Sequence, residues 1–265
     1  MDFEKLSRVM RETALQAGEK IMEIYDADDF DVRSKSDDSP VTAADEAADA
    51  IISAALCAAF PDVPLVTEEQ AATHTQDVNT FLIVDPLDGT KEFIQRRGDF
   101  TVNIAYVKDG LPIRGVVYAP AKSRLFYTDS KGKSVEEIGP FVNDVIGDTT
   151  TTTVSHADNS ALMVVASKSH RDQATDDYIS RYAVKDMKSA GSSLKFCLIA
   201  TGEADIYPRL GRTMEWDTAA GHAVLTGAGG KVVRYEDHKP LSYGKPTFAN
   251  PFFIATEPSV VLQKP

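Results

Sequence analysis

Cysteine is scarce in this chain, which has only Cys57 and Cys197 among its 265 residues. The two lie far apart in the sequence, and each sits in an apolar stretch of helical character. Neither has a second cysteine at the spacing of a metal-binding pair. We therefore expect two reduced thiols buried in the core of a cytoplasmic protein.

Long hydrophobic runs are also lacking. The longest purely apolar stretches are short, such as residues 54–60 (AALCAAF), whereas a bilayer-spanning helix needs about 20 such residues. The N-terminus carries charge within its first five residues, so we expect no secretory signal there. A composition that is 43% hydrophobic and 26% charged indicates a globular chain rather than a collagen, a coiled coil or a wholly disordered protein.

Basic residues are outnumbered, with 28 Lys and Arg against 40 Asp and Glu, which gives a formal net charge of −12. Such a surface disfavours non-specific binding to a nucleic-acid backbone or to anionic lipid, so we expect no nucleic-acid partner. A small anionic substrate remains compatible with this charge where some local feature reverses the field.

The spacing of apolar residues predicts both helices and strands. Steps of three and four predict an amphipathic helix over residues 3–25. A second helix is expected at 43–59, and Thr42 with Asp45 has the form of a capping box at its start. Elements of both kinds follow one another, which predicts layered α/β structure. The other expected elements are strands at 64–67, 81–84, 101–107, 115–119, 162–166 and 204–207, and helices at 172–182, 193–200 and 218–226.

Residues 148–153 (DTTTTT) form the one low-complexity run. The run is polar and β-branched, so it fits either a linker or an edge strand. We place a boundary there, which divides the chain into an N-terminal part, residues 1–150, and a C-terminal part, residues 151–265.

The segment 81–90 carries the strongest chemical signal. Its four apolar residues predict a buried strand that ends at Asp85, and Asp88 with Gly89 has turn chemistry. A helix start is expected at Thr90, where backbone N–H groups favour an anion. Two carboxylates beside an anion site conflict unless cations lie between them. The alternative is that Asp85 and Asp88 are only turn and capping residues.

Two more segments with acidic residues stand beside predicted elements. Glu68 and Glu69 follow a short strand, and Asp217, within WDTAA at 216–220, opens an alanine-rich helix. Helix capping and compensation of the helix dipole are the simpler interpretations of each when it is taken alone.

Taken together, the segments DPLDGT (85–90), EE (68–69) and WDTAA (216–220) resemble the metal-dependent inositol monophosphatase superfamily. The likeness is closer to its bacterial 3'(2'),5'-bisphosphate nucleotidase branch, and it extends from about residue 3 to residue 255. The resemblance implies a layered α/β/α/β/α sandwich, in which the larger N-terminal half holds most metal ligands. The segments specific to the branch are 35–45 (KSDDSPVTAAD), 88–94 (DGTKEFI), 100–105 (FTVNIA) and 191–197 (GSSLKFC).

The resemblance also implies a Mg²⁺ site. Two like charges about 4 Å apart repel by roughly 4 kcal/mol at an effective dielectric constant of about 20, so a bare carboxylate cluster would expel a phosphate. Two Mg²⁺ ions cancel the four carboxylates and a third leaves a positive pocket, so we expect two or three ions. The implied ligands are the side chains of Glu68, Asp85, Asp88 and Asp217 and the backbone carbonyl of Leu87.

The same resemblance implies Asp45, Thr90 and Glu68 as catalytic residues. The Thr90 hydroxyl would orient and help deprotonate a water, with Asp45 behind it. The alternatives are a capping role for Thr90 and the third position of a capping box for Asp45. The implied substrate-binding residues are Leu87, Asp88, Gly89, Thr90, Asp217, Ser192, Lys195 and His170. For Lys195 a solvated helix lysine, and for His170 a surface loop residue, fit the sequence equally well.

The activity that the resemblance implies is removal of the 3'-phosphate from adenosine 3',5'-bisphosphate in sulfur assimilation, with the sulfated nucleotide as a second substrate and Li⁺ as an inhibitor. Inositol monophosphatase or histidinol-phosphatase activity is the alternative within the superfamily, and an inactive scaffold or binding protein is the alternative of another class. We expect a cytoplasmic protein, either monomer or homodimer. Some relatives associate peripherally with the inner membrane, but no basic amphipathic stretch here requires it.

Overall fold

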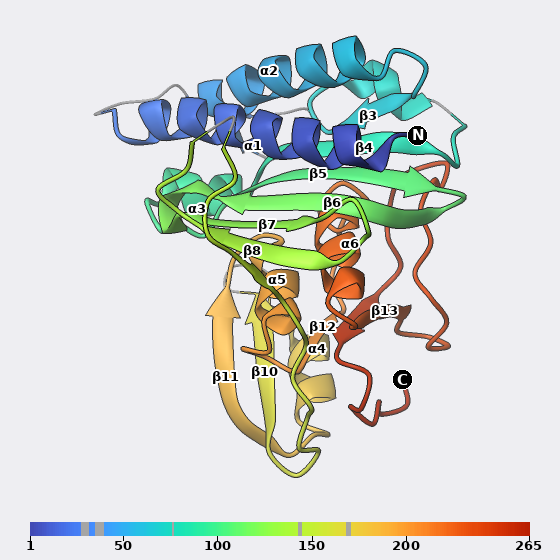
Figure 1. Ribbon diagram of the computed structural model, residues 1–265. Helices are drawn as coiled ribbons and strands as arrows, with labels where there is room; N and C mark the ends of the chain where they lie inside the picture. The colour runs from blue at the N-terminus through green and yellow to red at the C-terminus, as the bar shows by residue number, and fades with distance from the viewer. Residues whose placement is uncertain (28–31, 35–39, 76, 143–144, 168–170) are drawn as a thin grey trace.

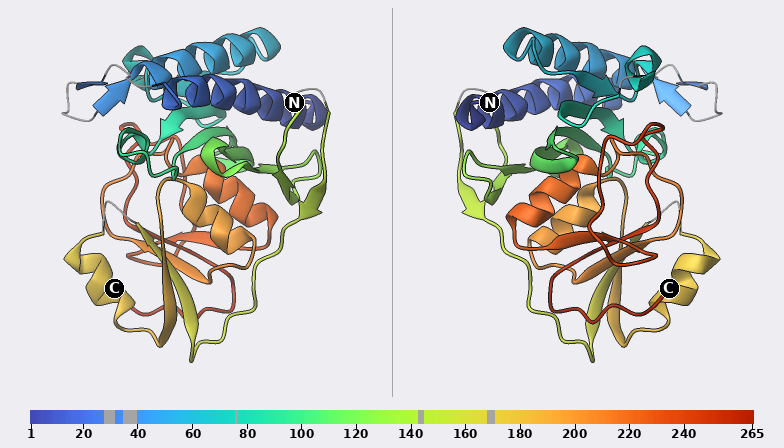
Figure 2. Two further views of the ribbon diagram at one scale, coloured as in Figure 1. Left: turned by 90° about the vertical axis from the view of Figure 1, so that its left-hand side faces the viewer. Right: turned by 90° about the vertical axis from the view of Figure 1, so that its right-hand side faces the viewer.

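The computed structural model describes residues 1–27, 32–34, 40–75, 77–142, 145–167 and 171–265. Its helices and sheets alternate in five layers (Figure 1). A helix pair, a seven-stranded sheet, a second helix pair, a five-stranded sheet and a last helix follow one another, and Figure 2 shows the same order from the two sides. The α/β/α/β/α sandwich that the resemblance implied is confirmed.

The first layer consists of α1 (Phe3–Tyr25) and α2 (Ala43–Ala59). Asp2 caps α1, and Thr42 with Asp45 forms the predicted capping box of α2. Each helix turns one apolar stripe inward, because its buried residues recur every three or four positions. The stripe of α1 includes Leu6, Met10, Ala14, Ala17 and Ile21.

The seven-stranded sheet has the order β3-β4-β5-β6-β7-β8-β9. Only the β3–β4 pair is parallel. In β4, Leu82 and Val84 join the core under α1 and α2, whereas Phe81 and Ile83 join the core on the other face. Both faces are therefore covered. The strands are β3 (Leu65–Thr67), β4 (Phe81–Asp88), β5 (Thr101–Lys108), β6 (Leu111–Ala119), β7 (Arg124–Thr128), β8 (Ser134–Ile138) and β9 (Thr149–Thr151).

The middle layer holds α5 (Leu194–Ala200) and α6 (Ala219–Gly227) between the two sheets. Small residues let α6 approach its neighbours closely. A Cβ on Gly115 of β6 would lie 2.6 Å from the Ala220 carbonyl oxygen, and a Cβ on Gly221 would lie 2.6 Å from the Phe196 ring. The start of α6, where Asp217 stands, is thereby pressed against the first sheet.

The second sheet has the order β11-β10-β12-β14-β13. Its inner face packs on α5 and α6, and its outer face packs on α4 (Gln173–Ile179), whose Tyr178 shares a core with Val164 of β10. The strands are β10 (Leu162–Ser167), β11 (Val184–Ala190), β12 (Ile206–Arg209), β13 (Lys231–Arg234) and β14 (Phe253–Thr256). The small elements are β1 (Val32–Ser34), β2 (Pro40–Thr42), η1 (Ala71–Thr75), α3 (Thr90–Ile94) and η2 (Pro120–Lys122).

Every helix and strand expected from the sequence is present, with ends that shift by a few residues. The Thr-rich run contributes β9, an edge strand of the first sheet. The prediction missed β1, β2, β7, β8, β11, β13 and β14. The expectation of two core thiols was half wrong: Cys197 is buried, and burial holds the pKa of its thiol well above the usual range, but Cys57 is exposed on α2.

Candidate active site

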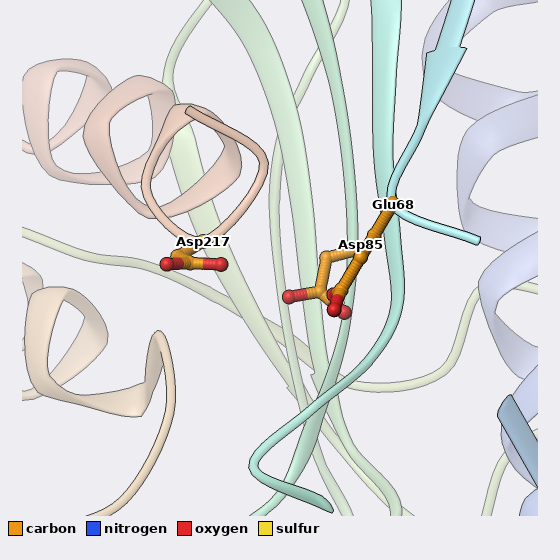
Figure 3. A group of neighbouring side chains, drawn as sticks. All are labelled: Glu68, Asp85 and Asp217. Carbon is orange, nitrogen blue, oxygen red and sulfur yellow. The ribbon is translucent and has the colours of Figure 1, made fainter. Parts of the chain in front are cut away.

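Three carboxylates converge where the first sheet meets α6 (Figure 3). Oxygen atoms of Glu68, Asp85 and Asp217 all lie within 4.8 Å of one another. Glu68 follows β3, and its N–H donates to the Val84 carbonyl at 3.1 Å, which sets it beside Asp85 of the parallel neighbour β4. Asp217 faces both from the start of α6. The structure thus brings together residues that the sequence separates widely.

A bulge in β4 adds a fourth carboxylate. Asp85 stands opposite Asn103, but Asp88 stands opposite Thr101, so β4 has one residue more than β5 over this stretch. Without that extra residue, positions three apart would face opposite sides of the sheet. Pro86 lies inside the bulge, where a missing N–H donor is tolerated.

Asp88 is held in place by Asn103 of β5 and by Ser193, the residue directly before α5. Its Oδ2 accepts hydrogen bonds from the Ser193 backbone N–H at 2.7 Å and from Asn103 Nδ2 at 3.2 Å. The Ser193 hydroxyl lies 3.1 Å from the same oxygen and 2.6 Å from the Asp217 carbonyl oxygen. Ser193 therefore links the Asp88 side of the site to the Asp217 side.

The chain turns sharply after Asp88. Gly89 has φ of 96°, and a Cβ there would lie 3.1 Å from the Asp99 carbonyl oxygen, so glycine is needed for both reasons. The turn starts α3 and directs the Thr90 hydroxyl back toward the strand, 3.4 Å from the Leu87 carbonyl oxygen. The Leu87 N–H donates to Asp85 Oδ1 at 3.1 Å, which fixes that carboxylate within the bulge.

Asp45 makes the hydrogen bonds of a capping box and also contacts Thr90. Its Oδ2 accepts from the Thr42 N–H at 2.8 Å and the Thr42 hydroxyl at 2.7 Å, which completes the capping box. Its Oδ1 accepts from the Thr90 hydroxyl at 3.2 Å. Asp45 is almost fully buried, at 1% exposure. The Asp45–Thr90 pair expected from the resemblance is thus formed in space, and its chemical role stays a prediction.

Two carboxylates at the site have a raised pKa, Asp217 and Asp88, and burial is the largest cause in both. Burial, together with the charges of Asp88 and Glu68, holds the pKa of Asp217 well above its usual range. Burial raises the pKa of Asp88 to about 6, although Lys195, Asn103 and Ser193 oppose the shift. An all-oxygen set of crowded, partly desolvated carboxylates suits a hard divalent cation, and Mg²⁺ fits this donor set.

The predicted substrate contacts Lys195, Ser192 and His170 differ in how the structure describes them. Lys195 is 4% exposed, so a solvated lysine is excluded. Its Nζ donates to the Ser192 carbonyl at 2.6 Å and lies 5.2 Å from the centre of the Tyr207 ring. Ser192 takes a positive φ of 47° and turns the chain so that Ser193, not Ser192, contacts Asp88. His170 lies outside the residues that the structure describes.

Three residues near the site were not selected from the sequence. Asn103 and Ser193 stand in segments that carried the resemblance, so a signal for both was present. Arg209 ends β12 and is buried. Burial lowers the pKa of Lys195 to about 8 and the charge of Arg209 adds to that shift, whereas the same charge opposes the burial that raises the pKa of Asp217. The sequence did carry a signal for Arg209, because the other residues of its strand are apolar or Pro and an arginine is unusual there.

The comparisons with known proteins agree with this geometry. The model of the inositol monophosphatase family matches residues 2–260, and the chain belongs to this family. Within it, the chain is 44% identical over 248 residues to the 3'(2'),5'-bisphosphate nucleotidase CysQ of Escherichia coli O157:H7, covering 91% of this chain and 95% of that one. It is 41% identical over 224 residues to the CysQ of Buchnera aphidicola, covering 83% and 80%.

Solved structures of the same family superpose on nearly the whole chain. The crystal structure of CysQ from Bacteroides thetaiotaomicron superposes with a TM-score of 0.81 at 37% identity, covering 98% of this chain and 99% of that one. An inositol monophosphatase from Anabaena superposes with a TM-score of 0.75 at 25% identity, covering 98% and 93%.

Proposed function

We propose that this chain is a Mg²⁺-dependent phosphomonoesterase that hydrolyses the 3'-phosphate of adenosine 3',5'-bisphosphate to give AMP and phosphate. The observation that carries the proposal is the carboxylate cluster of Glu68, Asp85 and Asp217, beside which Asp45 and Thr90 form a hydrogen-bonded pair. Similarity to relatives named 3'(2'),5'-bisphosphate nucleotidases supports the choice of substrate.

Glu68, Asp85, Asp88 and Asp217, with the Leu87 carbonyl, would hold two or three Mg²⁺ ions. Bound there, Mg²⁺ supplies charge neutralisation for the phosphoryl group and acidifies the attacking water. The family is typically metal-dependent, and the number of ions is part of our proposal.

Thr90 and Asp45 would manage the proton. The Thr90 hydroxyl donates to Asp45 Oδ1, so its oxygen lone pairs face away from that bond and can accept a hydrogen bond from the attacking water. The second oxygen of Asp45 is fixed by two donors of Thr42, so the carboxylate cannot turn away. A fixed acceptor of this kind orients the water and takes its proton through the hydroxyl.

A substrate with a second phosphate fits the buried cations. Lys195 of α5 lies close enough to Asp88, and Arg209 of β12 close enough to Asp217, to lower the pKa of that carboxylate. In a chain of net charge −12, two buried cations beside the cluster favour an additional anionic group. We propose that they, with Ser192, face the nucleotide, and that the Gly89 and Thr90 N–H groups face the phosphoryl oxygens. The nucleotide contact of His170, which lies outside the described residues, stays a prediction from the resemblance.

The other interpretations of the sequence are not favoured. The named inositol monophosphatase structures are 25% identical or less, against 44% for the nucleotidase relatives. An inactive scaffold would not need the complete set of carboxylates that the site retains.

The halves 1–150 and 151–265 would meet at the site. Cytoplasmic location, peripheral membrane association and monomer or homodimer state remain predictions; no helix of the described residues is long and apolar enough to cross a membrane.

A substrate panel tests the proposal. Phosphate release is measured from adenosine 3',5'-bisphosphate, the sulfated nucleotide, inositol 1-phosphate and histidinol phosphate, each with Mg²⁺ and with chelator. We expect Mg²⁺-dependent release that is fastest from the nucleotide bisphosphate. Preference for inositol 1-phosphate or histidinol phosphate would assign the sibling activity, and no release from any substrate would favour the scaffold.

A further inference from the structure

His74 contacts the segment that carries Glu68. It lies in η1 and is partly buried. Its Nε2 is 2.8 Å from the carbonyl oxygen of Thr67, the residue directly before Glu68. Because a carbonyl oxygen can only accept, Nε2 carries the proton and donates it to this bond. The imidazole therefore holds the end of β3 from outside the sheet.

The ring of His74 also contacts the segment that carries Asp217. It stacks on Trp216, the residue directly before Asp217, with ring centres 4.7 Å apart and planes inclined by 25°. Phe248 lies 6.2 Å from both rings, and its carbonyl accepts from the Glu215 N–H at 2.7 Å. Trp216 is thus fixed within an aromatic group of which His74 forms one wall.

Hydrogen bonds to β3 and α2 anchor η1 and the residues before it, and they fix the position of His74. Thr73 Oγ1 accepts from the Thr67 N–H at 3.2 Å and lies 2.7 Å from the Gln70 carbonyl. Gln70 Nε2 donates to Asp49 Oδ2 of α2 at 2.7 Å, and the other oxygen of Asp49 accepts from the Thr67 hydroxyl. A movement of His74 would have to disturb β3 and α2 together.

From this geometry we propose that His74 is a positioning residue that sets the separation of Glu68 and Asp217. The two carboxylates come from opposite sides of the site and repel each other, and their segments lie far apart in the sequence. A side chain that is hydrogen-bonded to one segment and stacked on the other opposes that repulsion. The proposal rests on the proposed function in one respect, because it takes the cluster to be the Mg²⁺ site.

The experiment separates the two contacts of the imidazole. His74→Phe keeps a ring for stacking but has no donor, His74→Gln keeps a donor but has no ring, and His74→Ala loses both. His156→Ala is the matched control, since His156 is exposed. Trp216 is the chain's only tryptophan, so its emission reports a Mg²⁺ titration without any turnover. Calorimetric Mg²⁺ titration and kcat at saturating Mg²⁺ complete the set.

We expect all three His74 variants to need about 10-fold more Mg²⁺ for half-saturation, as is found when groups that orient metal ligands are removed. Their kcat at saturating Mg²⁺ should fall less than about 3-fold, because the bound ions restore the spacing of the carboxylates. The His156→Ala protein should match the wild type in both respects.

If His74→Phe bound Mg²⁺ with wild-type affinity, ring packing alone would suffice. If His74→Gln bound Mg²⁺ with wild-type affinity, the hydrogen bond alone would suffice. Either result overturns the bridging role, as does wild-type affinity in His74→Ala. Failure of the proposed function looks different, because the wild-type protein itself would then bind no Mg²⁺ or release no phosphate.

Discussion

Replacing Asp88 by Asn should make the metal-free protein more stable at neutral pH while weakening its response to Mg²⁺. In the folded chain, burial raises the pKa of Asp88 from an ordinary 3.8 to about 6. Keeping this carboxylate ionised in the fold therefore costs about 3 kcal/mol at most, at about 1.4 kcal/mol for each factor of ten in proton affinity. An Asn oxygen can still accept from Ser193 and Asn103, so the substitution removes the charge with little loss of packing.

The sign of the pH dependence follows from the raised pKa. Between about pH 4 and pH 6 the folded protein holds a proton on Asp88 that the unfolded chain has released, so stability falls as the pH rises through this window. The Asn variant lacks this slope. The two proteins should therefore have similar free energies of unfolding near pH 4, and the variant should be the more stable one near pH 7.5 by up to about 3 kcal/mol.

Urea unfolding in chelator at pH 4.5, 6 and 7.5, followed by circular dichroism, measures this difference. Repeating the series in Mg²⁺ should stabilise the wild type more than the variant, because ligand binding to the folded state adds to its stability. A variant that is no more stable than the wild type in chelator at pH 7.5, or an equal gain of both proteins from Mg²⁺, would refute this role of the Asp88 charge.

Three further predictions concern the Asp45–Thr90 pair, the choice of metal ion and Gly191. Asp45→Asn and Thr90→Val should each lower kcat by about 10²-fold or more with little change in Mg²⁺ dependence, and the double variant should be little worse than either; a loss of melting temperature with unchanged kcat would leave Asp45 as a helix cap only. Ca²⁺, which prefers looser and higher coordination than Mg²⁺, should bind but inhibit, and full turnover in Ca²⁺ would contradict a tight octahedral site. Gly191→Ala would place a Cβ 2.4 Å from the Asp99 carbonyl oxygen, so it should cost roughly 1–3 kcal/mol of stability in thermal unfolding; a normal melting temperature would show that the loop before Ser193 can shift freely.

The sequence predicted the parts of the site that depend on local pattern. Asp85 ends an apolar run, Asp88 stands before a turn glycine, and Thr42 with Asp45 has capping-box spacing, so local pattern was enough to place each on its element. The resemblance then grouped these elements, and the cluster of Glu68, Asp85 and Asp217 agrees with that grouping.

The rest depends on contacts between distant segments. The bulge that turns Asp88 to the same side as Asp85 is visible only when β4 is aligned with β5. Which of two adjacent serines contacts Asp88 is decided by the positive φ at Ser192, a backbone property that no residue pattern here specifies. The burial of Lys195 was not predicted, although a signal was present: the other residues of α5 are apolar around its whole circumference, which leaves no solvent-facing side for a lysine.

The most direct test of the account is the product formed from adenosine 3',5'-bisphosphate, identified by chromatography while Mg²⁺ is titrated, for the wild type and Asp217→Asn in parallel. We expect AMP and inorganic phosphate from the wild type, at a rate that rises with Mg²⁺ and disappears in chelator, and a rate lower by several orders of magnitude in the variant. Product formation that persists in chelator, or a variant as fast as the wild type at low Mg²⁺, would contradict the assignment of this carboxylate cluster as the catalytic metal site.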